Sequence, residues 1–309
     1  MSPPRIFIDG EHGTTGLLIR ELILARNDMQ LLSIATDKRK DSAERKRLLN
    51  SVDVAILCLP DDAARESVAM LENAEVAVVD ASTAHRINPD WAFGFPEMTA
   101  TQPALIRASK RIANPGCWST CYIALMRPLV DVGLIPTNYA ATTWGVSGFS
   151  GGGRQMVEDF ESGANKSPFF SYGLKLAHKH LPEMQHYSGL THAPVFNPSV
   201  GNYRQGMLVH IPIALWALAK PVTGAMIADA LRAHYAGQKH VTVHSFVGIE
   251  PVAELHPEAL NGTNQLELFV FENSKNGQVT LVARLDNLGK GAGRAALQNT
   301  LLLLDLAPQ

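Results

Sequence analysis

The sequence predicts an α/β protein, with a Rossmann-type parallel-sheet domain followed by an α+β catalytic domain whose sheet is mixed or antiparallel. Two observations support this prediction. Before residue 117, short apolar runs alternate with helical patterns, which is typical of a parallel sheet covered on both faces. After residue 117, longer β-rich stretches dominate. Because 309 residues exceed what one small core needs, two domains are expected.

The first half begins with an apolar run at 5–10 that ends in glycine. A glycine loop and the helical spacing of "LLIRELILAR" follow, so strand, loop and helix are predicted in that order. Further strands are expected at 29–37, 51–60, 75–82 and 110–116, with a helix at 61–74.

The second half is predicted to start with a helix from Cys117 to near Gly133. "SKNG" separates two later β-rich stretches, and its Asn276-Gly277 pair is typical of a hairpin turn. The β-rich stretches are 139–148, 206–218, 239–249, 264–273 and 277–287, and helices are expected at 223–235 and 291–306. We therefore expect one domain at 1–116 with the C-terminal helix 289–309, and another at 117–288.

The composition excludes several classes of function. With 46% hydrophobic and 18% charged residues, the chain can bury a large core. A formal net charge of −2 does not indicate a nucleic-acid or membrane-surface partner. No apolar run reaches the roughly 20 residues of a membrane span, and "MSPPRIFIDG" lacks the apolar core of a signal peptide. Three cysteines make no disulfide framework, and their odd number favours reduced thiols, so we expect a cytoplasmic protein.

The glycine loop "GEHGTTG" predicts a dinucleotide site. Gly10, Gly13 and Gly16 lie between the first strand and its helix, where glycines let the backbone approach a pyrophosphate at the helix N-terminus. The spacing is G-x-x-G-x-x-G rather than G-x-G-x-x-G, so its position after the strand carries the prediction.

The charged stretch "ATDKRKD" bears on the choice between NAD and NADP. Asp37 favours a ribose hydroxyl, whereas Lys38, Arg39 and Lys40 favour a 2′-phosphate, and a solvated loop is the alternative. We predict NADP. The candidate cofactor-binding residues are Gly10, Gly13, Thr14, Thr15, Gly16, Lys38, Arg39, Pro60, Ser82 and Asn287.

"NPGCWST" places Cys117 at the start of a predicted helix. Backbone N–H groups and the helix dipole stabilise a thiolate there and can stabilise an oxyanion beside it. A thioester accepts hydride better than an oxygen ester, so cysteine suits the interconversion of an acyl group and an aldehyde. The alternative is a small apolar residue at a turn. Cys58, in an apolar strand, and Cys121, one helical turn from Cys117, are expected to be core residues.

"AHKHLPEM" supplies His178 and His180 as candidate acids or bases, because histidine titrates near neutral pH. Two surface histidines are the alternative. A metal site with Glu183 lacks a further ligand, so no metal is predicted.

Other motifs add candidate contacts. Arg154 ends the small-residue loop "GVSGFSGGGR" with a fork suited to a carboxylate or phosphate. Ser82 and Arg86 follow a strand end, where ligands of such sheets gather, and "DNLGKGAGRAALQN" places Asn287 before the final helix. The candidate substrate-binding residues are His178, Arg154, Ser147, Gly148, Asn114, Arg86 and Glu183.

Together these motifs resemble the short form of the N-acetyl-γ-glutamyl-phosphate reductases, in the semialdehyde dehydrogenase superfamily. The matching elements keep the family's order and span almost the whole chain: "GEHGTTG", "VDASTAHR", "NPGCWST", "GVSGFSGGGR", "HKHLPEM" and "DNLGKGAGRAALQN". The glycine loop departs from the long form's G-A-[ST]-G-Y-x-G, which leaves the cofactor contacts to be defined.

The resemblance implies NADPH-dependent reductive dephosphorylation of N-acetyl-glutamyl 5-phosphate, in arginine biosynthesis, by a homo-oligomer. It implies a thioester on Cys117, with His180 as the acid/base and His178 as a substrate or orienting contact, although the sequence leaves the choice between them open. The alternatives are a related dehydrogenase for an aspartyl or aminoadipyl substrate and a nucleotide-binding sensor without turnover.

Overall fold

The computed structural model describes residues 2–308, which form two compact units. The first unit contains the described residues up to 96, residues 100–116 and the described residues from 292 onward. The second contains residues 97–99 and 117–291. The last segment thus joins the first unit at residue 292, whereas the sequence suggested residue 289. The predicted fold class is confirmed, because one unit has a parallel sheet and the other a mixed sheet.

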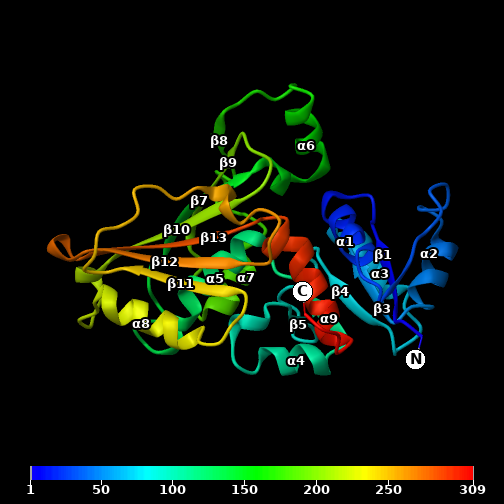
Figure 1. Cartoon of the computed structure of the whole chain (residues 1–309), viewed down its shortest axis with the longest axis horizontal. Coiled ribbons are helices and arrows are strands. Elements are labelled where there is room, and N and C mark those ends of the chain that lie inside the picture. Colours follow the sequence, from blue (N-terminus) through cyan, green and yellow to red (C-terminus); the bar gives the residue numbers. More distant parts are fainter. Residues whose placement is uncertain (1, 309) are drawn as a thin grey trace. The chain divides into compact units, whose positions relative to one another are not determined.

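The first unit is built on a six-stranded parallel sheet with the order β2-β1-β3-β4-β6-β5. Figure 1 labels β1, β3, β4 and β5 of this sheet. Its strands are β1 (Arg5–Asp9), β2 (Gln30–Leu32), β3 (Val54–Leu57), β4 (Ala77–Asp80), β5 (Ala92–Phe93) and β6 (Arg111–Ala113). Its helices are α1 (Thr14–Leu24), α2 (Ser42–Leu49), α3 (Asp61–Ala69), α4 (Gln102–Ala108) and α9 (Arg294–Leu303).

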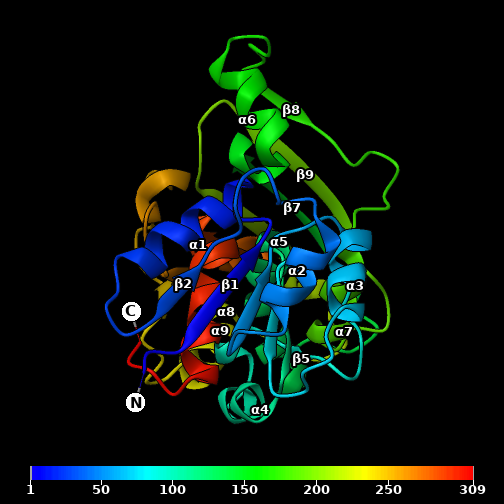
Figure 2. The ribbon, with the colours of Figure 1, turned by 90° about the vertical axis from the view of Figure 1, so that its right-hand side faces the viewer.

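Alternate residues of these strands enter two different cores. In β1, Ile6 and Ile8 pack on the α1 side, and Phe7 packs on the opposite side. Figure 2 shows α1 on one side of β1 and α2 and α3 on the other. Both faces of the sheet are therefore covered by helices, which explains why its strands are apolar without alternation.

Helix α9 returns to the first unit from the far end of the sequence. Its Ala296, Leu297 and Leu301 are buried in the same core as Ile6 and Ile8. Asn299, fully buried on α9, donates to the carbonyl of Gly94 at 2.9 Å. The C-terminal helix is thus an integral part of the first unit's core.

The second unit contains a seven-stranded mixed sheet with the order β11-β12-β13-β10-β7-β9-β8. Its strands are β7 (Thr142–Gly148), β8 (Phe169–Ser171), β9 (Val195–Gly201), β10 (Met207–Ala214), β11 (Val241–Phe246), β12 (Leu266–Asn273) and β13 (Gln278–Leu285). Its helices are α5 (Cys117–Asp131), α6 (Gly153–Glu161), α7 (Leu181–Ser188) and α8 (Gly224–His234), with a π-helix at Gly289–Gly293.

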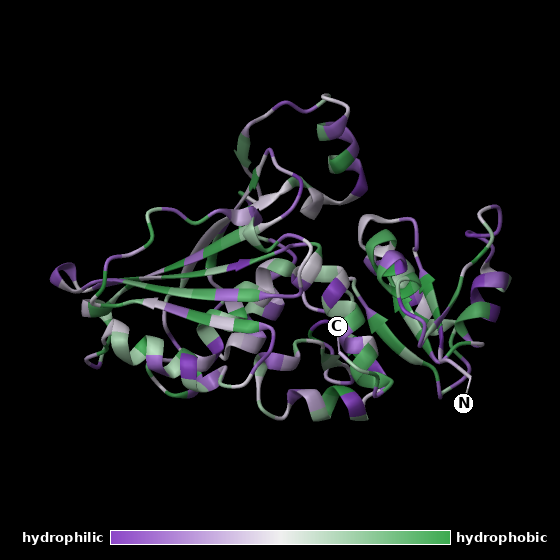
Figure 3. Cartoon of the chain, in the orientation of Figure 1, coloured by the Kyte–Doolittle hydropathy of each residue, from purple (hydrophilic) through white to green (hydrophobic). Residues whose placement is uncertain are grey.

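Helix α5 is the centre of this unit. It packs against the sheet and against α7 and α8, and it is buried along nearly its whole length. Figure 3 shows hydrophobic colouring along the strands of the second sheet. Such a central helix gives its first residue, Cys117, a fixed position in the unit.

Most predicted elements are present, with a few differences. The strand expected at 29–37 is only Gln30–Leu32. The sequence did not indicate α2, because its polar sequence "SAERKRLL" buries only its last two residues. It also did not indicate β9, since Pro198 lies within it and proline normally argues against a strand. The hairpin is confirmed, with Gly277 at a φ of 60° between β12 and β13. Among residues 2–308, no helix is long and apolar enough to span a membrane.

Candidate active site

The glycine loop lies at the topological switch point of the first sheet. Strand β1 has β2 on one side and β3 on the other, so the connections diverge at its carboxyl end. In open parallel sheets, ligands bind in the crevice at this point. The loop from Gly10 to Gly16 therefore occupies the position that a nucleotide site requires.

The three glycines of the loop are not all there for the same structural reason. Gly10 has a φ of 91°, and a Cβ there would lie 2.3 Å from the carbonyl oxygen of Cys58. A Cβ on Gly16 would lie 2.4 Å from the carbonyl oxygen of Gly10. The fold itself thus requires both of these glycines.

Gly13 is not explained in this way. Its φ is −76°, and the nearest atom to a Cβ there would be 3.5 Å away, which is ordinary contact. Gly13 is the N-cap of α1, and no side chain caps this helix. A bare backbone at an uncapped helix N-terminus is suited to close approach by a phosphate. The residues therefore fit a dinucleotide pyrophosphate.

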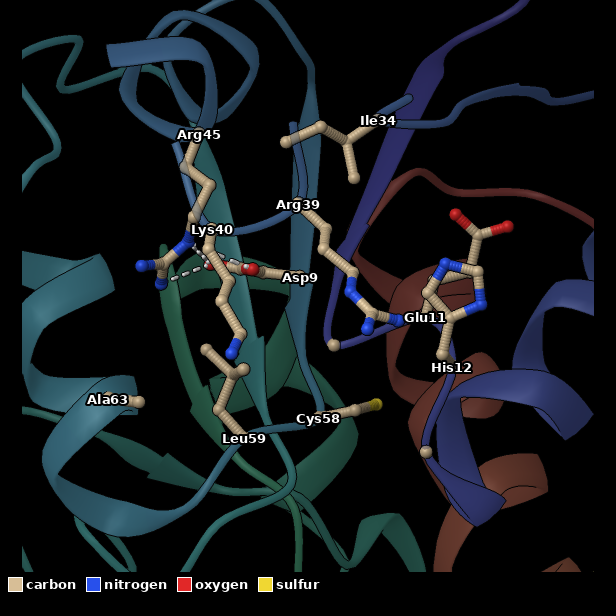
Figure 4. A pocket seen from close by; sticks show the side chains of 12 residues that line it. Asp9, Glu11, His12, Ile34, Arg39, Lys40, Arg45, Cys58, Leu59 and Ala63 are labelled. Atoms are coloured by element: carbon tan, nitrogen blue, oxygen red, sulfur yellow. Dashed lines mark hydrogen bonds and ion pairs between the residues drawn. The ribbon is translucent and has the colours of Figure 1, made fainter. Parts of the chain in front are cut away.

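A pocket of about 350 Å³ opens beside the loop, within the first unit. Figure 4 shows Arg39 and Lys40 directed into it. The lining residues are Asp9, Gly10, Glu11, His12, Gly13, Ile34, Arg39, Lys40, Arg45, Cys58, Leu59 and Ala63. Lys38, which was also predicted to contact the cofactor, is exposed and is not among them.

The acidic residues of this pocket are paired with basic residues of the chain. Asp9 is buried and accepts from Arg45, with Nη2 to Oδ2 at 2.9 Å. Buried Glu11 pairs with Arg20, with Nε to Oε1 at 2.6 Å. Because Arg45 is committed to Asp9, the exposed Arg39 and Lys40 are the lining cations best suited to a ligand phosphate.

Two further cofactor candidates have other local roles. Pro60 is the N-cap of α3. Asn287 lies in the second unit, where its Nδ2 donates to the Ser150 hydroxyl at 2.9 Å and its Oδ1 accepts from the Gly206 N–H at 2.7 Å. Both polar groups of Asn287 are thus engaged in holding loops of its own unit together.

Ser82, Arg86 and Asn114 have hydrogen-bond partners within the first unit. The hydroxyl of Ser82 donates to Asp80 at 2.7 Å, and the Nε of Arg86 donates to the Asn114 carbonyl at 3.0 Å. The Asn114 side chain donates to the carbonyl of Ala292 at 3.1 Å. Buried Arg86 and Asn114 therefore fix the chain just before the cysteine.

Cys117 is the first residue of α5 and is half-buried. Gly291 packs directly on it, because a Cβ on Gly291 would lie 2.6 Å from the Cys117 Cβ. Cys58 and Cys121 differ, since burial raises the pKa of the Cys58 thiol to about 12 and raises that of Cys121 well above its usual value. The placement at a helix N-terminus favours a reactive thiolate at Cys117 alone.

The two histidines lie together in the second unit. Their ring centroids are 4.7 Å apart, and the His180 backbone N–H donates to Nδ1 of His178 at 3.1 Å. In its neutral form, His178 therefore carries its proton on Nε2. His180 is buried at the N-cap of α7, and His178 is half-buried.

Aromatic residues connect the histidines to the start of α5. Phe196 contacts both His178 and Trp118, with ring centroids 5.1 and 5.2 Å apart. The Tyr172 hydroxyl accepts from Trp118 Nε1 at 3.1 Å, and its ring lies 5.7 Å from that of His178. Burial, and secondarily the charge of Cys117, raises the pKa of Tyr172.

Sequence reasoning did not identify Tyr172. It lies in a segment without periodicity, six positions before His178, and only the proximity of that histidine motif could have drawn attention to it.

The remaining substrate candidates are distributed over the second unit. Ser147 and Gly148 end β7 and are buried, and Gly148 is packed against the backbone of Arg204 and Gln205. Arg154 lies on α6, is two-thirds exposed and pairs with Glu158 at 2.7 Å, so it is not part of the histidine cluster. Glu183 is buried in the first turn of α7, one turn from His180. Within residues 2–308, no group of three or more His, Cys, Asp or Glu side chains is arranged to hold a metal ion.

The fold and the cysteine-centred site define a semialdehyde dehydrogenase. Residues 10–105 match the NAD-binding domain of this family, and residues 117–287 match its dimerisation domain. More specifically, the chain belongs to the N-acetyl-γ-glutamyl-phosphate reductases, as the sequence resemblance predicted. It is 49% identical to the enzyme of that name from Mesorhizobium japonicum over 98% of this chain and 99% of the relative. The relative from Chelativorans is 50% identical over 97% and 98% of the two chains.

Solved structures support the fold. Aspartate semialdehyde dehydrogenase II from Vibrio cholerae, complexed with ASA, covers 99% of both chains with a TM-score of 0.76 and 14% identity. Aspartate semialdehyde dehydrogenase with NADP from Candida albicans has a TM-score of 0.66 and 16% identity, covering 98% of this chain and 99% of that chain. At such identities, the likeness concerns the fold alone.

Proposed function

We propose that this protein catalyses the NADPH-dependent reductive dephosphorylation of N-acetyl-glutamyl 5-phosphate to N-acetyl-glutamate 5-semialdehyde, a step of arginine biosynthesis. The main observation is Cys117 at the first position of a buried helix, in the same unit as a histidine pair. The near-50% identity to reductases of this name favours the N-acetylglutamyl substrate over aspartyl or aminoadipyl substrates.

The cofactor is NADP(H), held by the first unit. Gly13 and the N-terminus of α1 suit its pyrophosphate, and Arg39 and Lys40 suit its 2′-phosphate. The chemistry supplied by the bound nicotinamide is hydride transfer, which converts a thioester into a thiohemiacetal. Lys38, Pro60 and Ser82 are weaker candidates for direct contact, because their side chains lie off the pocket or have partners elsewhere.

Cys117 is the nucleophile in this proposal. Its thiolate attacks the acyl carbon, the acyl–oxygen bond breaks, and inorganic phosphate leaves with the bonding electron pair. Amides at the start of α5 lie beside the sulfur and suit the oxyanion that forms during attack. After reduction, the carbon–sulfur bond breaks, the aldehyde is released and the thiolate is restored.

The histidines supply and remove the proton of the thiohemiacetal oxygen. Sequence reasoning favoured His180 for this role and His178 for substrate contact. The bond from the His180 N–H to Nδ1 of His178 now favours His178 as the proton donor, because it fixes the proton on Nε2. His180 then orients His178 through this bond and through their perpendicular rings.

We also propose a homo-oligomer in the cytoplasm. On the sheet face away from α5, Trp144 is 47% exposed and stacks on His210 with centroids 4.0 Å apart. The match to a dimerisation domain supports this proposal, and aromatic side chains such as Trp144 are enriched at interfaces between proteins. The structure joins none of Cys58, Cys117 and Cys121 in a disulfide, and reduced cysteines are usual in cytoplasmic proteins.

The reverse reaction provides the test. We would measure phosphate-dependent reduction of NADP⁺ with N-acetyl-glutamate 5-semialdehyde, with aspartate semialdehyde as the comparison substrate. We expect preference for the acetylated aldehyde, and we expect Cys117→Ser to lower kcat by on the order of 10³-fold or more. Cys121→Ser is the matched control and should retain activity. No turnover of either aldehyde despite tight NADPH binding would contradict the proposed activity and favour a sensor.

The histidine roles are separated by two variants. His178→Asn should abolish the pH dependence of kcat near neutrality, whereas His180→Asn keeps the backbone N–H and should retain part of it. The opposite ranking would assign the acid/base role to His180.

A further inference from the structure

A buried lysine precedes Gly291, the glycine that packs on Cys117, and has no role in the mechanism above. Lys290 belongs to the π-helix Gly289–Gly293, and its side chain is 1% exposed. Its Nζ donates to Oε1 of Glu97 at 2.7 Å, and the Glu97 side chain is 2% exposed. Burying two charges costs several kcal/mol, and replacing such a pair with apolar residues is often harmless to stability. Stability alone therefore does not explain why this ion pair is buried here.

The turn that carries Lys290 is packed on both sides without space for side chains. A Cβ on Gly289 would lie 2.3 Å from the carbonyl oxygen of Thr263. A Cβ on Gly291 would lie 2.6 Å from the Cβ of Cys117. Lys290 stands between these two glycines, so its anchor determines where the backbone of Gly291 meets Cys117. Single π-helical turns within a chain are often found at functional sites.

The other end of the pair is attached to the helices around α5. Glu97 lies in the short 3₁₀-helix Pro96–Met98, and Nε2 of His234 lies 3.1 Å from the Met98 carbonyl oxygen. The next residue of α8, Tyr235, donates to the carbonyl of Ala124 in α5 at 2.9 Å. Lys290 is thus tied, through Glu97, to the frame that holds the helix of Cys117.

Several titratable groups surround the pair and influence one another. Burial lowers the pKa of Lys290, while Glu97 opposes that effect. His240 faces the pair, and its pKa is lowered mainly by burial and then by Lys290. Burial, Glu97 and Asp131 together raise the pKa of Tyr235. The contact itself is set by geometry, since Nζ of Lys290 lies 2.7 Å from Oε1 of Glu97 with both side chains almost fully buried.

We propose that Lys290 is a positioning residue: its buried ion pair with Glu97 holds Gly291 against Cys117 and so fixes the direction of the thiol for attack on the acyl carbon. This inference rests on the proposed function for its effect on turnover. Its effect on the thiol itself is independent of the substrate.

The first test uses Lys290→Met, which keeps an unbranched side chain, one atom shorter, without the charge. We expect kcat to fall about 100-fold, the cost of a misplacement of about 1 Å at a reacting group, with the Kd for NADPH unchanged. Alkylation of Cys117 by iodoacetamide should slow about tenfold, with its pH profile shifted upward, because the thiol leaves the helix N-terminus. Burial raises the pKa of both other thiols, to about 12 for the half-buried Cys58, so neither should contribute, and Cys117→Ser gives the background rate.

Two further variants distinguish positioning from a general loss of stability or charge. Arg284→Met breaks the largely buried Arg284–Glu267 pair of the same unit, and neither of these side chains is among the atoms nearest Gly291. It should lower the melting temperature but leave the alkylation rate at the wild-type value. The double variant Lys290→Met/Glu97→Gln restores the net charge without the anchor, so kcat and alkylation should both stay low.

Recovery of both rates in the double variant would overturn the proposal, since the pair would then act only through charge. Wild-type alkylation and kcat in folded Lys290→Met would overturn it as well. If wild type itself fails to turn over the acetylated substrate, the proposed function fails, whereas the alkylation results still decide the role of Lys290.

Discussion

Replacement of Gly13 by alanine should weaken cofactor binding without damaging the fold. The nearest atoms to the new methyl group would be the carbonyl oxygens of Gly10 and Cys58, at 3.5 and 3.9 Å, so the chain has room for it. The backbone at Gly13, with φ −76° and ψ 163°, is also open to alanine. Stability should therefore change by less than about 1 kcal/mol, the size of an N-cap effect.

Binding should respond more strongly than stability. The methyl group would occupy the space through which a pyrophosphate approaches the α1 N-terminus. We expect the Kd for NADPH to rise about tenfold, which corresponds to ~1.4 kcal/mol. Titration of NADPH fluorescence measures the Kd, and thermal unfolding of the same samples measures stability.

Gly16→Ala is the matched control within the same loop. Its methyl group would lie 2.4 Å from the Gly10 carbonyl oxygen and 2.9 Å from Glu11, so the backbone must shift. We expect a loss of about 1–3 kcal/mol in stability, as for other overpacked sites. If Gly13→Ala binds NADPH within a factor of two of wild type, or loses as much stability as Gly16→Ala, the ligand explanation of Gly13 is wrong.

Three further predictions follow from the pocket, the loops and the second sheet. Arg39→Ala should weaken NADPH binding but not NADH binding, whereas Lys38→Ala should affect neither, because Arg39 lines the pocket and Lys38 does not. An equal loss of affinity for NADPH and NADH in Arg39→Ala would refute this prediction. Asn287→Ala should destabilise the protein by about 1–3 kcal/mol and leave the Kd for NADPH unchanged, since both polar groups of the side chain form hydrogen bonds within the second unit. A higher Kd in a variant of unchanged stability would show instead that Asn287 contacts the cofactor. Burial lowers the pKa of His210 from 6.5 to about 4, so the unfolded state binds more protons between these values and folding stability declines as pH falls through that window. Urea unfolding of wild type and His210→Phe across this range should show a smaller decline in the variant, and parallel curves would contradict the assignment.

The sequence predicted those elements for which the local residue pattern and the position in the fold require the same structure. Strand β1, the glycine loop and α1 could be predicted from the sequence, because the spacing of apolar residues and the positions of the glycines both follow from the Rossmann arrangement. Cys117 was recognisable as a helix start, because Pro115-Gly116 precede an apolar helical pattern. The hairpin at Gly277 was indicated by a two-residue turn signal that needs no long-range information.

What the sequence could not indicate depends on distant contacts. Asn287 and Asn114 look like ligand-binding residues in a motif, yet hydrogen bonds to Ser150, Gly206 and Ala292 engage their side chains. Tyr172 has no motif of its own and becomes relevant only when it is placed beside Trp118 and His178. The Lys290–Glu97 pair joins residues almost two hundred positions apart, which no local pattern can reveal.

The discontinuous composition of the first unit has a consequence during protein synthesis. Helix α9 supplies Ala296, Leu297 and Leu301 to the core formed with Ile6 and Ile8. A nascent chain that leaves the ribosome amino terminus first therefore carries an incompletely covered apolar sheet face while the whole second unit is being translated. Such exposed surfaces favour aggregation and chaperone binding. The nucleotide-binding unit is the first to emerge and the last whose core is complete.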